Sequence, residues 1–294
     1  LAGSVSALES VSVVPWVEVS AWEVGVASWS LSGLVQPGPR MKSRKGSAPR
    51  MTPILTLCVP GSPVHRAFEF TGCVTIGPMV GLGAWYTPPA LVSVLVDAAH
   101  QGWRRAGCRG VPRVLDPACG EGAFLVAVAE RLCRTATPDQ VASGLYGIDV
   151  DAAALARARQ RLGDVLGEQA GDVHLVCTDA LLAPPDWSPF DWVLGNPPWV
   201  SAATLSRRQG AWRERVRASF ETARGNWDLC CPFVERALDW TRPGGWHGFV
   251  LPNAFASAPY GSAARALVAA QQVQQLWDWS ETTPFGASAY PVGY

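Results

Sequence analysis

From residue 113 onward, short apolar segments alternate with longer segments in which apolar residues have helical spacing. The expected strands are 113–118, 144–150, 173–180, 190–195, 246–252 and 273–279. The expected helices are 89–101, 123–134, 153–166, 228–240 and 262–271. Parallel strands need crossover connections, and the crossover helices cover both faces of the sheet. The alternation therefore predicts an α/β fold with a doubly wound, mostly parallel sheet.

Composition and charge narrow the classes of protein further. The chain has 294 residues, of which 48% are hydrophobic and 16% charged, so it is not a wholly disordered chain. Basic and acidic residues number 24 each, so net charge gives no argument for a nucleic acid or a membrane surface. The eight cysteines include no C-x-x-C pair. Neither a metal site nor a disulfide framework is indicated, and the reducing cytoplasm is the default location.

The first eighty residues have a different pattern. Glu18 and Glu23 interrupt the apolar stretch that could otherwise have formed a membrane helix, and there is no basic segment typical of a signal peptide. Residues 36–51 have the Pro/Gly/basic composition of a linker. We expect residues 1–80 to be a weakly structured or non-native extension, with a small accessory module as the alternative, and residues 81–294 to form the main domain.

Glycines follow the first expected strand and acidic residues follow the next two. Gly120 and Gly122 allow a tight turn and a close ligand approach, and the helix that starts at residue 123 offers free N–H groups. Asp149 stands where doubly wound folds place the carboxylate that binds ribose hydroxyls. The alternative is a tight turn and a surface acid. Asp179 is placed to meet the base of a nucleoside, and it could equally be an ordinary helix cap.

The motif Asn196-Pro197-Pro198-Trp199 directly follows the fourth expected strand. Two prolines remove two N–H donors and fix φ, so the Asn196 amide and the Pro197 carbonyl can present acceptor oxygens toward one point. Two acceptors beside a planar aromatic ring suit a flat amine, whereas the alternative is a rigid turn capped by a packed Trp. We expect the motif at the crevice between strands 1 and 4, where a doubly wound sheet reverses its winding.

The order of these motifs resembles that of the S-adenosylmethionine-dependent N6-adenine DNA methyltransferases of restriction-modification systems, in which the cofactor motif precedes the catalytic one. The resemblance covers residues 83–294 and rests on Y-T-P-P (86–89), D-P-A-C-G-E-G-A-F (116–124), Asp149, Asp179, N-P-P-W (196–199), N-W-D (226–228), R-P-G-G (242–245) and V-L-P-N-A-F (250–255). It implies a Rossmann-like class I methyltransferase fold, with residues 81–294 as the catalytic domain.

The resemblance also implies roles for individual residues. The implied contacts of the cofactor S-adenosylmethionine are Tyr86, Thr87, Pro88, Asp116, Ala118, Gly120, Gly122, Asp149 at the ribose, Asp179 at the adenine amino group, and Phe190 or a neighbouring apolar side chain against that adenine. The implied catalytic residues are Asn196, Pro197, Pro198 and Trp199. In this scheme Asn196 Oδ1 and the Pro197 carbonyl accept both protons of the target amine, Trp199 stacks on the flipped base, and no covalent intermediate forms.

Charge gives mixed support to DNA as the partner. Residues 85–294 carry 18 basic and 20 acidic side chains, a net charge of −2, which is poor for holding a polyanion. An arginine-rich segment after the catalytic motif is the local exception, and we expect it to contact DNA through Arg207, Arg208, Arg213, Arg215 and Arg217. The alternative is a solvated helix face.

The C-terminal residues limit the expected architecture. The family has a seventh, antiparallel strand between strands 5 and 6, usually followed by a target-recognition domain. Residues 284–294 suffice for part of that strand. We therefore expect an incomplete last strand and no recognition domain. The chain is then either a C-terminally truncated fragment or a catalytic subunit whose DNA sequence is read by a separate polypeptide; no membrane or metal partner is expected. The alternatives are a methyltransferase for a protein glutamine or an RNA guanine amine, and a non-catalytic fragment that binds cofactor or a partner.

Overall fold

The computed structural model describes residues 87–187, 189–205, 209–279 and 291–293. The predicted extension, residues 1–80, lies outside the described residues, and so do Tyr86, Arg207 and Arg208.

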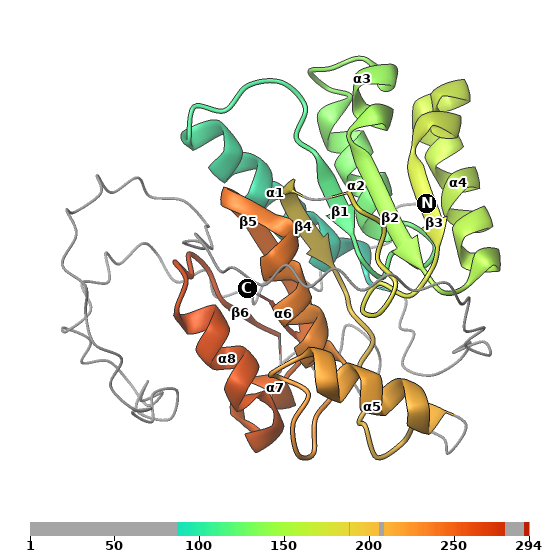
Figure 1. Ribbon diagram of the computed structural model, residues 1–294. Helices are drawn as coiled ribbons and strands as arrows, with labels where there is room; N and C mark the ends of the chain where they lie inside the picture. The colour runs from blue at the N-terminus through green and yellow to red at the C-terminus, as the bar shows by residue number, and fades with distance from the viewer. Residues whose placement is uncertain (1–86, 188, 206–208, 280–290, 294) are drawn as a thin grey trace, which may run out of the picture. The chain divides into compact units, whose positions relative to one another are not determined.

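Within the described residues, seven strands form one sheet in the order β3-β2-β1-β4-β5-β7-β6 (Figure 1). The strands are β1 (Val114–Asp116), β2 (Leu145–Asp149), β3 (His174–Cys177), β4 (Phe190–Gly195), β5 (Thr241–Pro252), β6 (Trp277–Asp278) and β7 (Pro291–Gly293). Strands β1 to β5 pair in parallel, and β7 lies antiparallel between β5 and β6. The predicted doubly wound, mostly parallel sheet is confirmed, and so is the antiparallel strand between strands 5 and 6.

The helices are α1 (Pro89–Arg105), α2 (Ala123–Leu132), α3 (Pro138–Ser143), α4 (Ala152–Leu166), α5 (Gly210–Ser219), α6 (Cys230–Trp240), α7 (Ala254–Ser257) and α8 (Ser262–Ala269), with short 3-10 turns η2 (Gly167–Asp172) and η4 (Pro259–Gly261). Helices α1, α2 and α4 pack on one face of the sheet, and α6 and α8 pack on the other (Figure 1). Two hydrophobic clusters result, one on each face.

Alternating side chains of β4 contribute to both clusters. Trp192 and Leu194 belong to the cluster under α1 and α2, whereas Val193 belongs to the cluster under α6. Trp192 pairs with Trp246 of β5, and a Cβ at Gly102 of α1 would lie 1.5 Å from the Trp246 ring. Glycine at position 102 therefore lets α1 lie directly on a tryptophan of the sheet.

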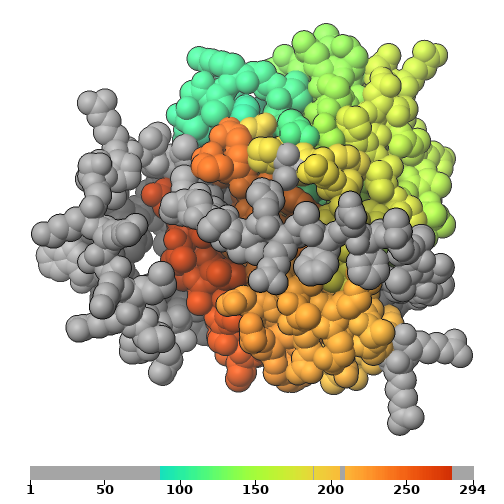
Figure 2. All heavy atoms as spheres, viewed as in Figure 1, coloured from blue at the N-terminus to red at the C-terminus, as the bar shows by residue number. Residues whose placement is uncertain are grey.

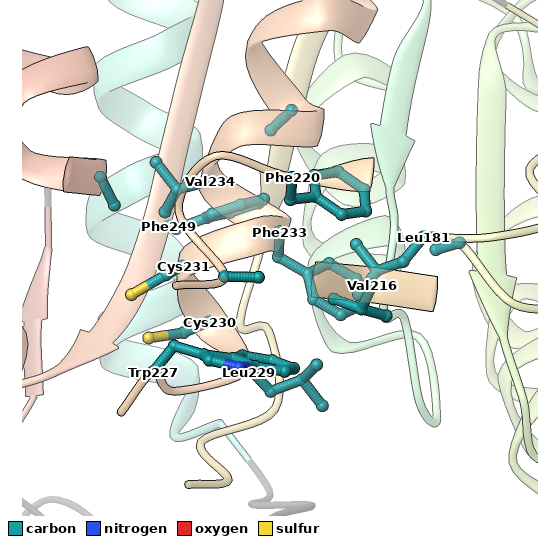
Figure 3. Close-up of a cluster of buried hydrophobic side chains, with 14 of the residues drawn as sticks. Leu181, Val216, Phe220, Trp227, Leu229, Cys230, Cys231, Phe233, Val234 and Phe249 are labelled. Atoms are coloured by element: carbon teal, nitrogen blue, oxygen red, sulfur yellow. The ribbon is translucent and has the colours of Figure 1, made fainter. Parts of the chain in front are cut away.

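The cluster on the other face holds the segment that leaves the N-P-P-W motif. Trp227 and Leu229 are both about 1% exposed and lie beside Cys230 at the start of α6 (Figure 3). The Leu229 N–H donates to the Val200 carbonyl at 2.8 Å, and the Ala202 N–H donates to the Trp227 carbonyl at 2.9 Å. This short antiparallel pairing attaches the motif to a buried part of the core.

Several elements differ from the sequence-based expectation. Strand β5 begins at Thr241 instead of the expected residue 246, because Thr241 already pairs with Phe190 of β4. The next pair is Trp192 with Trp246, so residues 242–245 form an irregularity within the strand. Gly244 has φ 76° there. Helices α3, α5 and α7 were not predicted. Thr137 and Gln140 form a capping box and Pro138 is the first helical residue, a pattern that identifies α3.

Candidate active site

Strands β1 and β4 are neighbours, and their carboxyl ends bring two motifs together. Asp116 ends β1, and Gly195 ends β4 immediately before Asn196. A Cβ at Gly195 would lie 2.7 Å from Asp116 Oδ1, so a larger residue would displace this carboxyl group. The predicted position of the N-P-P-W motif, directly after β4 and beside the carboxyl end of β1, is confirmed.

Asp116 is a buried acid at this crevice. It is 2% exposed, and its Oδ1 accepts a hydrogen bond from the Ala118 N–H at 3.1 Å. Burial raises the pKa of Asp116 to about 8, and the negative charge of Asp149 acts in the same direction, whereas the Ala118 N–H lowers it. Near neutral pH the Asp116 carboxyl group is therefore mainly protonated.

The glycine turn after β1 is held by the acid that ends β2. Gly120 and Gly122 have φ values of 51° and 80°, and a Cβ at Gly120 would meet nothing within 4 Å. Gly122 is the N-cap of α2 and provides no side-chain cap. Asp149 accepts hydrogen bonds from Gly120 N–H at 2.7 Å and from Asp151 N–H at 2.9 Å. Asp149 thus ties β2 to an open turn at the N-terminus of α2, and its ribose contact stays a prediction.

Burial also affects Asp149 itself. Its pKa is raised mainly by burial, while the N–H groups of Asp151 and Gly120 lower it. The two acids Asp116 and Asp149 therefore belong to one partly desolvated edge of the sheet, and Asp149 contributes to the shift of Asp116.

Asp179 closes the turn that follows β3. Its Oδ1 accepts the N–H groups of Leu181 at 2.8 Å and Leu182 at 3.2 Å. Its Oδ2 accepts a hydrogen bond from Trp212 Nε1 at 2.6 Å. Asp179 acts as a capping residue here, and its contact with a nucleoside base stays a prediction. Sequence reasoning missed Trp212, although Trp212 and Val216 have the i, i+4 spacing of a buried helix stripe.

The Asn196 side chain is oriented by the segment that precedes α1. Its Nδ2 donates to Thr87 Oγ1 at 3.0 Å, and Thr87 is 5% exposed. Among the described residues, the buried Oδ1 of Asn196 has no hydrogen-bond partner. Pro197 is buried and Pro198 is half-buried, and neither has an N–H to offer. An oriented acceptor without a donor remains at the crevice.

Trp199 lies between the two hydrophobic clusters and is half-buried. Its Nε1 donates to the Val250 carbonyl of β5 at 3.4 Å. The ring is therefore fixed relative to the sheet by a hydrogen bond and by packing.

Phe190 is the one described residue of the predicted set that the structure places elsewhere, which corrects the implied contact with the cofactor's adenine. It is fully buried at the first position of β4, at the opposite end of that strand from Asn196. Its ring packs against Tyr146 at 5.1 Å, and the Arg113 guanidinium lies over it. A parallel strand places its first residue at the amino edge of the sheet, away from the crevice.

The arginine-rich segment forms α5 in part. Arg213 and Arg217 both form ion pairs with Glu214, at 3.8 and 3.4 Å, and Arg213 also donates to the Ala202 carbonyl. Within the described residues no cluster of His, Cys, Asp and Glu could hold a metal ion. No helix in that part of the chain is long and apolar enough to cross a membrane.

The sheet order and the motifs at its carboxyl edge define a Rossmann-like class I methyltransferase fold. A protein from Listeria monocytogenes described as a class I S-adenosylmethionine-dependent methyltransferase superposes with a TM-score of 0.51 at 20% identity, over 70% of this chain and 57% of the other. The type IIG restriction endonuclease BpuSI superposes with a TM-score of 0.56 at 18% identity, over 72% of this chain and 25% of the other. These identities establish the fold alone.

Sequence comparison is more specific. Residues 185–285 match the Eco57I restriction-modification methylase family. The chain is 30% identical to the Type II methyltransferase M.XhoI of Xanthomonas vasicola, in an alignment that covers 63% of this chain. It is 28% identical to the Type II methyltransferase M.BstVI of Geobacillus stearothermophilus, in an alignment that covers 72% of this chain. The predicted resemblance to restriction-modification methyltransferases is confirmed. The matches span 36% and 41% of the length of these two relatives.

Proposed function

We propose that the chain transfers a methyl group from S-adenosylmethionine to the exocyclic N6 amine of adenine in DNA. The observation that carries this proposal is the buried, oriented Oδ1 of Asn196 at the crevice between β1 and β4. The similarity to the Type II methyltransferases M.XhoI and M.BstVI supports the same class of reaction.

The residues on the cofactor side fit S-adenosylmethionine. The space beside Gly120 is open, the N-terminus of α2 has no side-chain cap, and Asp149 lies at the same turn. We assign ribose binding to Asp149, the cofactor's adenine amino group to Asp179, and the methionine end to the region of Thr87, Pro88, Asp116 and Ala118. The bound cofactor supplies an electrophilic methyl group on a sulfonium.

Asn196 and Pro197 supply the acceptors for the target amine. An exocyclic amine is a weak nucleophile because its lone pair is delocalised into the ring. Hydrogen bonds from its two protons to Asn196 Oδ1 and the Pro197 carbonyl favour a pyramidal nitrogen with an available lone pair. Positioning and electrostatic stabilisation are then sufficient, with no covalent intermediate.

The target atom must leave the duplex to reach this crevice, which is the general solution of enzymes that modify bases. Trp199, held by the Val250 carbonyl, offers an aromatic face for stacking. The arginines of α5 are proposed to contact phosphates. We also propose that a separate polypeptide supplies sequence recognition and that the protein works in the cytoplasm.

Methyl transfer from labelled S-adenosylmethionine to DNA, RNA and protein in parallel tests the proposal. Labelled DNA is digested to nucleosides, and we expect the label in N6-methyl-2′-deoxyadenosine. Label only in protein or RNA supports the glutamine or guanine alternative instead. Binding of the cofactor without transfer to any of the three substrates supports the non-catalytic alternative.

A further inference from the structure

Three N–H donors fix the Asp179 carboxylate before any ligand is considered. Two backbone donors, Leu181 and Leu182, face Oδ1, and the Trp212 indole faces Oδ2 at 2.6 Å. A carboxylate offers about four acceptor sites, so about one remains for a further donor. The direction of that remaining site depends on both oxygens being held, and the indole is what holds Oδ2.

The indole comes from α5, a helix with two buried side chains. Trp212 and Val216 are the buried residues of α5, at 8% and 0% exposure. The basic side chains of the same helix include Arg213, Arg215 and Arg217. In the space-filling view, α5 lies at the lower edge of the described surface (Figure 2). The helix that carries the proposed phosphate contacts is thus attached to the domain through the residue that holds Asp179.

A second connection joins the two regions through α6. Arg236 Nη2 donates to the Leu181 carbonyl at 2.9 Å, and its guanidinium lies 4.8 Å from the centroid of the Phe220 ring. Phe220 is the C-cap of α5. Leu181, Val216 and Phe220 lie in one cluster (Figure 3). The Asp179 turn and α5 are therefore held together at both ends of the helix.

We infer that Trp212 is a positioning residue for Asp179 and that it couples the arginine-bearing helix α5 to the cofactor edge of the sheet. The inference rests on the proposed function, which assigns the cofactor's adenine to Asp179 and phosphates to α5. A ligand held by Asp179 stabilises the Trp212 bond and thereby the position of α5. By linkage, DNA bound to α5 strengthens cofactor binding by the same factor.

The test measures affinity with the full chain and S-adenosylhomocysteine, the demethylated cofactor, which cannot be turned over. Calorimetric titrations are run with and without a mixed-sequence duplex, and duplex binding is measured with and without the nucleoside ligand. In the wild-type chain we expect each ligand to strengthen the other by about fivefold or more. The variant Trp212→Phe keeps an aromatic side chain and removes the donor, so the coupling factor should fall to about one.

Two further variants separate positioning from folding. Ser219→Ala changes an exposed residue of the same helix and removes no contact with Asp179, so it should keep the coupling. Asp179→Asn retains Trp212, and its effect on nucleoside affinity should be non-additive with that of Trp212→Phe, because both variants break the same bond.

Each outcome bears on one proposal. Wild-type binding of both ligands without coupling overturns the inference and leaves the proposed function intact. Unchanged coupling in Trp212→Phe, or tighter nucleoside binding by that variant, overturns it as well, the latter because Trp212 would then compete for Asp179. A wild-type chain that binds neither ligand counts against the proposed function itself.

Discussion

The side-chain amide of Asn196 donates a hydrogen bond at 3.0 Å to the hydroxyl of Thr87, 109 residues earlier in the chain. The bond joins the residue before the N-cap of α1 to the residue after β4. It commits Nδ2, so the buried Oδ1, which has no hydrogen-bond partner among the described residues, is the acceptor that remains. Thr87 was predicted to contact the cofactor, and the structure shows that its hydroxyl orients the proposed catalytic amide.

Thr87→Val therefore should lower kcat for methyl transfer while leaving cofactor affinity nearly unchanged. The loss should be about tenfold, because one neutral hydrogen bond contributes about 1 kcal/mol and misplacement of the acceptor adds to it. Steady-state kinetics and calorimetric titration with S-adenosylhomocysteine measure the two effects separately. Thr87→Ser, which keeps the hydroxyl, should restore most of the rate. A weakened cofactor affinity of Thr87→Val with an unchanged kcat would show that Thr87 contacts the cofactor and does not orient Asn196.

Asn196→Ala should abolish methyl transfer and leave cofactor affinity nearly intact, because the Asn196 side chain meets the target amine. Loss of one preorganised hydrogen-bonding group costs on the order of 100-fold or more in rate. The measurement is transfer of labelled methyl groups to unmethylated DNA. Gln160→Ala is the control, since Gln160 is an exposed residue of α4 outside all of the motifs. Near-normal turnover by the Asn196 variant would show that its role is wrongly assigned.

Asp149→Ala should weaken cofactor binding. Two ribose hydroxyls lose a charged acceptor, each bond being worth roughly 1.5–3 kcal/mol, and the Gly120 N–H loses its partner. Calorimetric titration with S-adenosylmethionine should show a loss of more than about tenfold. Asp151→Ala is the control, because Asp151 caps α4 through the Ala153 N–H and its side chain is not the one that holds Gly120. Equal cofactor affinities of the Asp149 variant and the wild-type chain would show that Asp149 does not bind the ribose.

The sequence predicted which residues lie at the carboxyl ends of the strands, but it did not predict the side-chain contacts that these residues make. The position of Asn196 followed from its place after a strand, because the carboxyl ends of parallel strands share one edge. The same reasoning places Phe190, the first residue of that strand, at the other edge, and the resemblance alone suggested otherwise.

Long-range contacts had no local signal. The bonds from Asn196 to Thr87 and from Trp212 to Asp179 join residues far apart in sequence, so no spacing rule reveals them. Residues 242–245 have turn composition and form a bulge within β5, because β4 pairs with Thr241 and Trp246 on either side of them. The sequence did not show that the strand begins before this bulge.

The buried acid Asp116 predicts a pH dependence of stability. Its pKa of about 8 in the folded chain exceeds the ordinary aspartate value of 3.8, so between these two pH values the folded chain keeps a proton that the unfolded chain releases. Its contribution to stability is therefore greatest at low pH and is lost as pH rises from about 4 to 8. Asp116→Asn imitates the protonated carboxyl group and keeps the acceptor for Ala118 N–H.

Urea unfolding of both chains at pH 5, 6.5 and 8 measures this effect. The variant should gain stability relative to the wild-type chain as pH rises, by up to about 1.4 kcal/mol per pH unit. A constant difference between the two chains across this range would show that Asp116 does not titrate there.

Binding of DNA by this chain alone should be weak, sensitive to salt and without sequence preference. The few arginines of α5 can contact phosphates, but phosphate contacts carry no sequence information, and the net charge of −2 over residues 85–294 opposes them. Glu214 is paired with both Arg213 and Arg217, so Glu214→Gln should strengthen binding and steepen its salt dependence, whereas Arg217→Gln should reduce the salt slope by about one.

Titration of a panel of duplexes across a salt series tests this expectation. The comparison variant is Arg224→Gln, because Arg224 is exposed and lies beyond the C-terminal end of α5. The wild-type chain should bind all duplexes equally at each salt concentration, because attraction to phosphates is the same for every sequence. Tight binding to one duplex at physiological salt would instead show that base edges are already read by this chain, and the proposal of a separate recognition polypeptide would then be wrong.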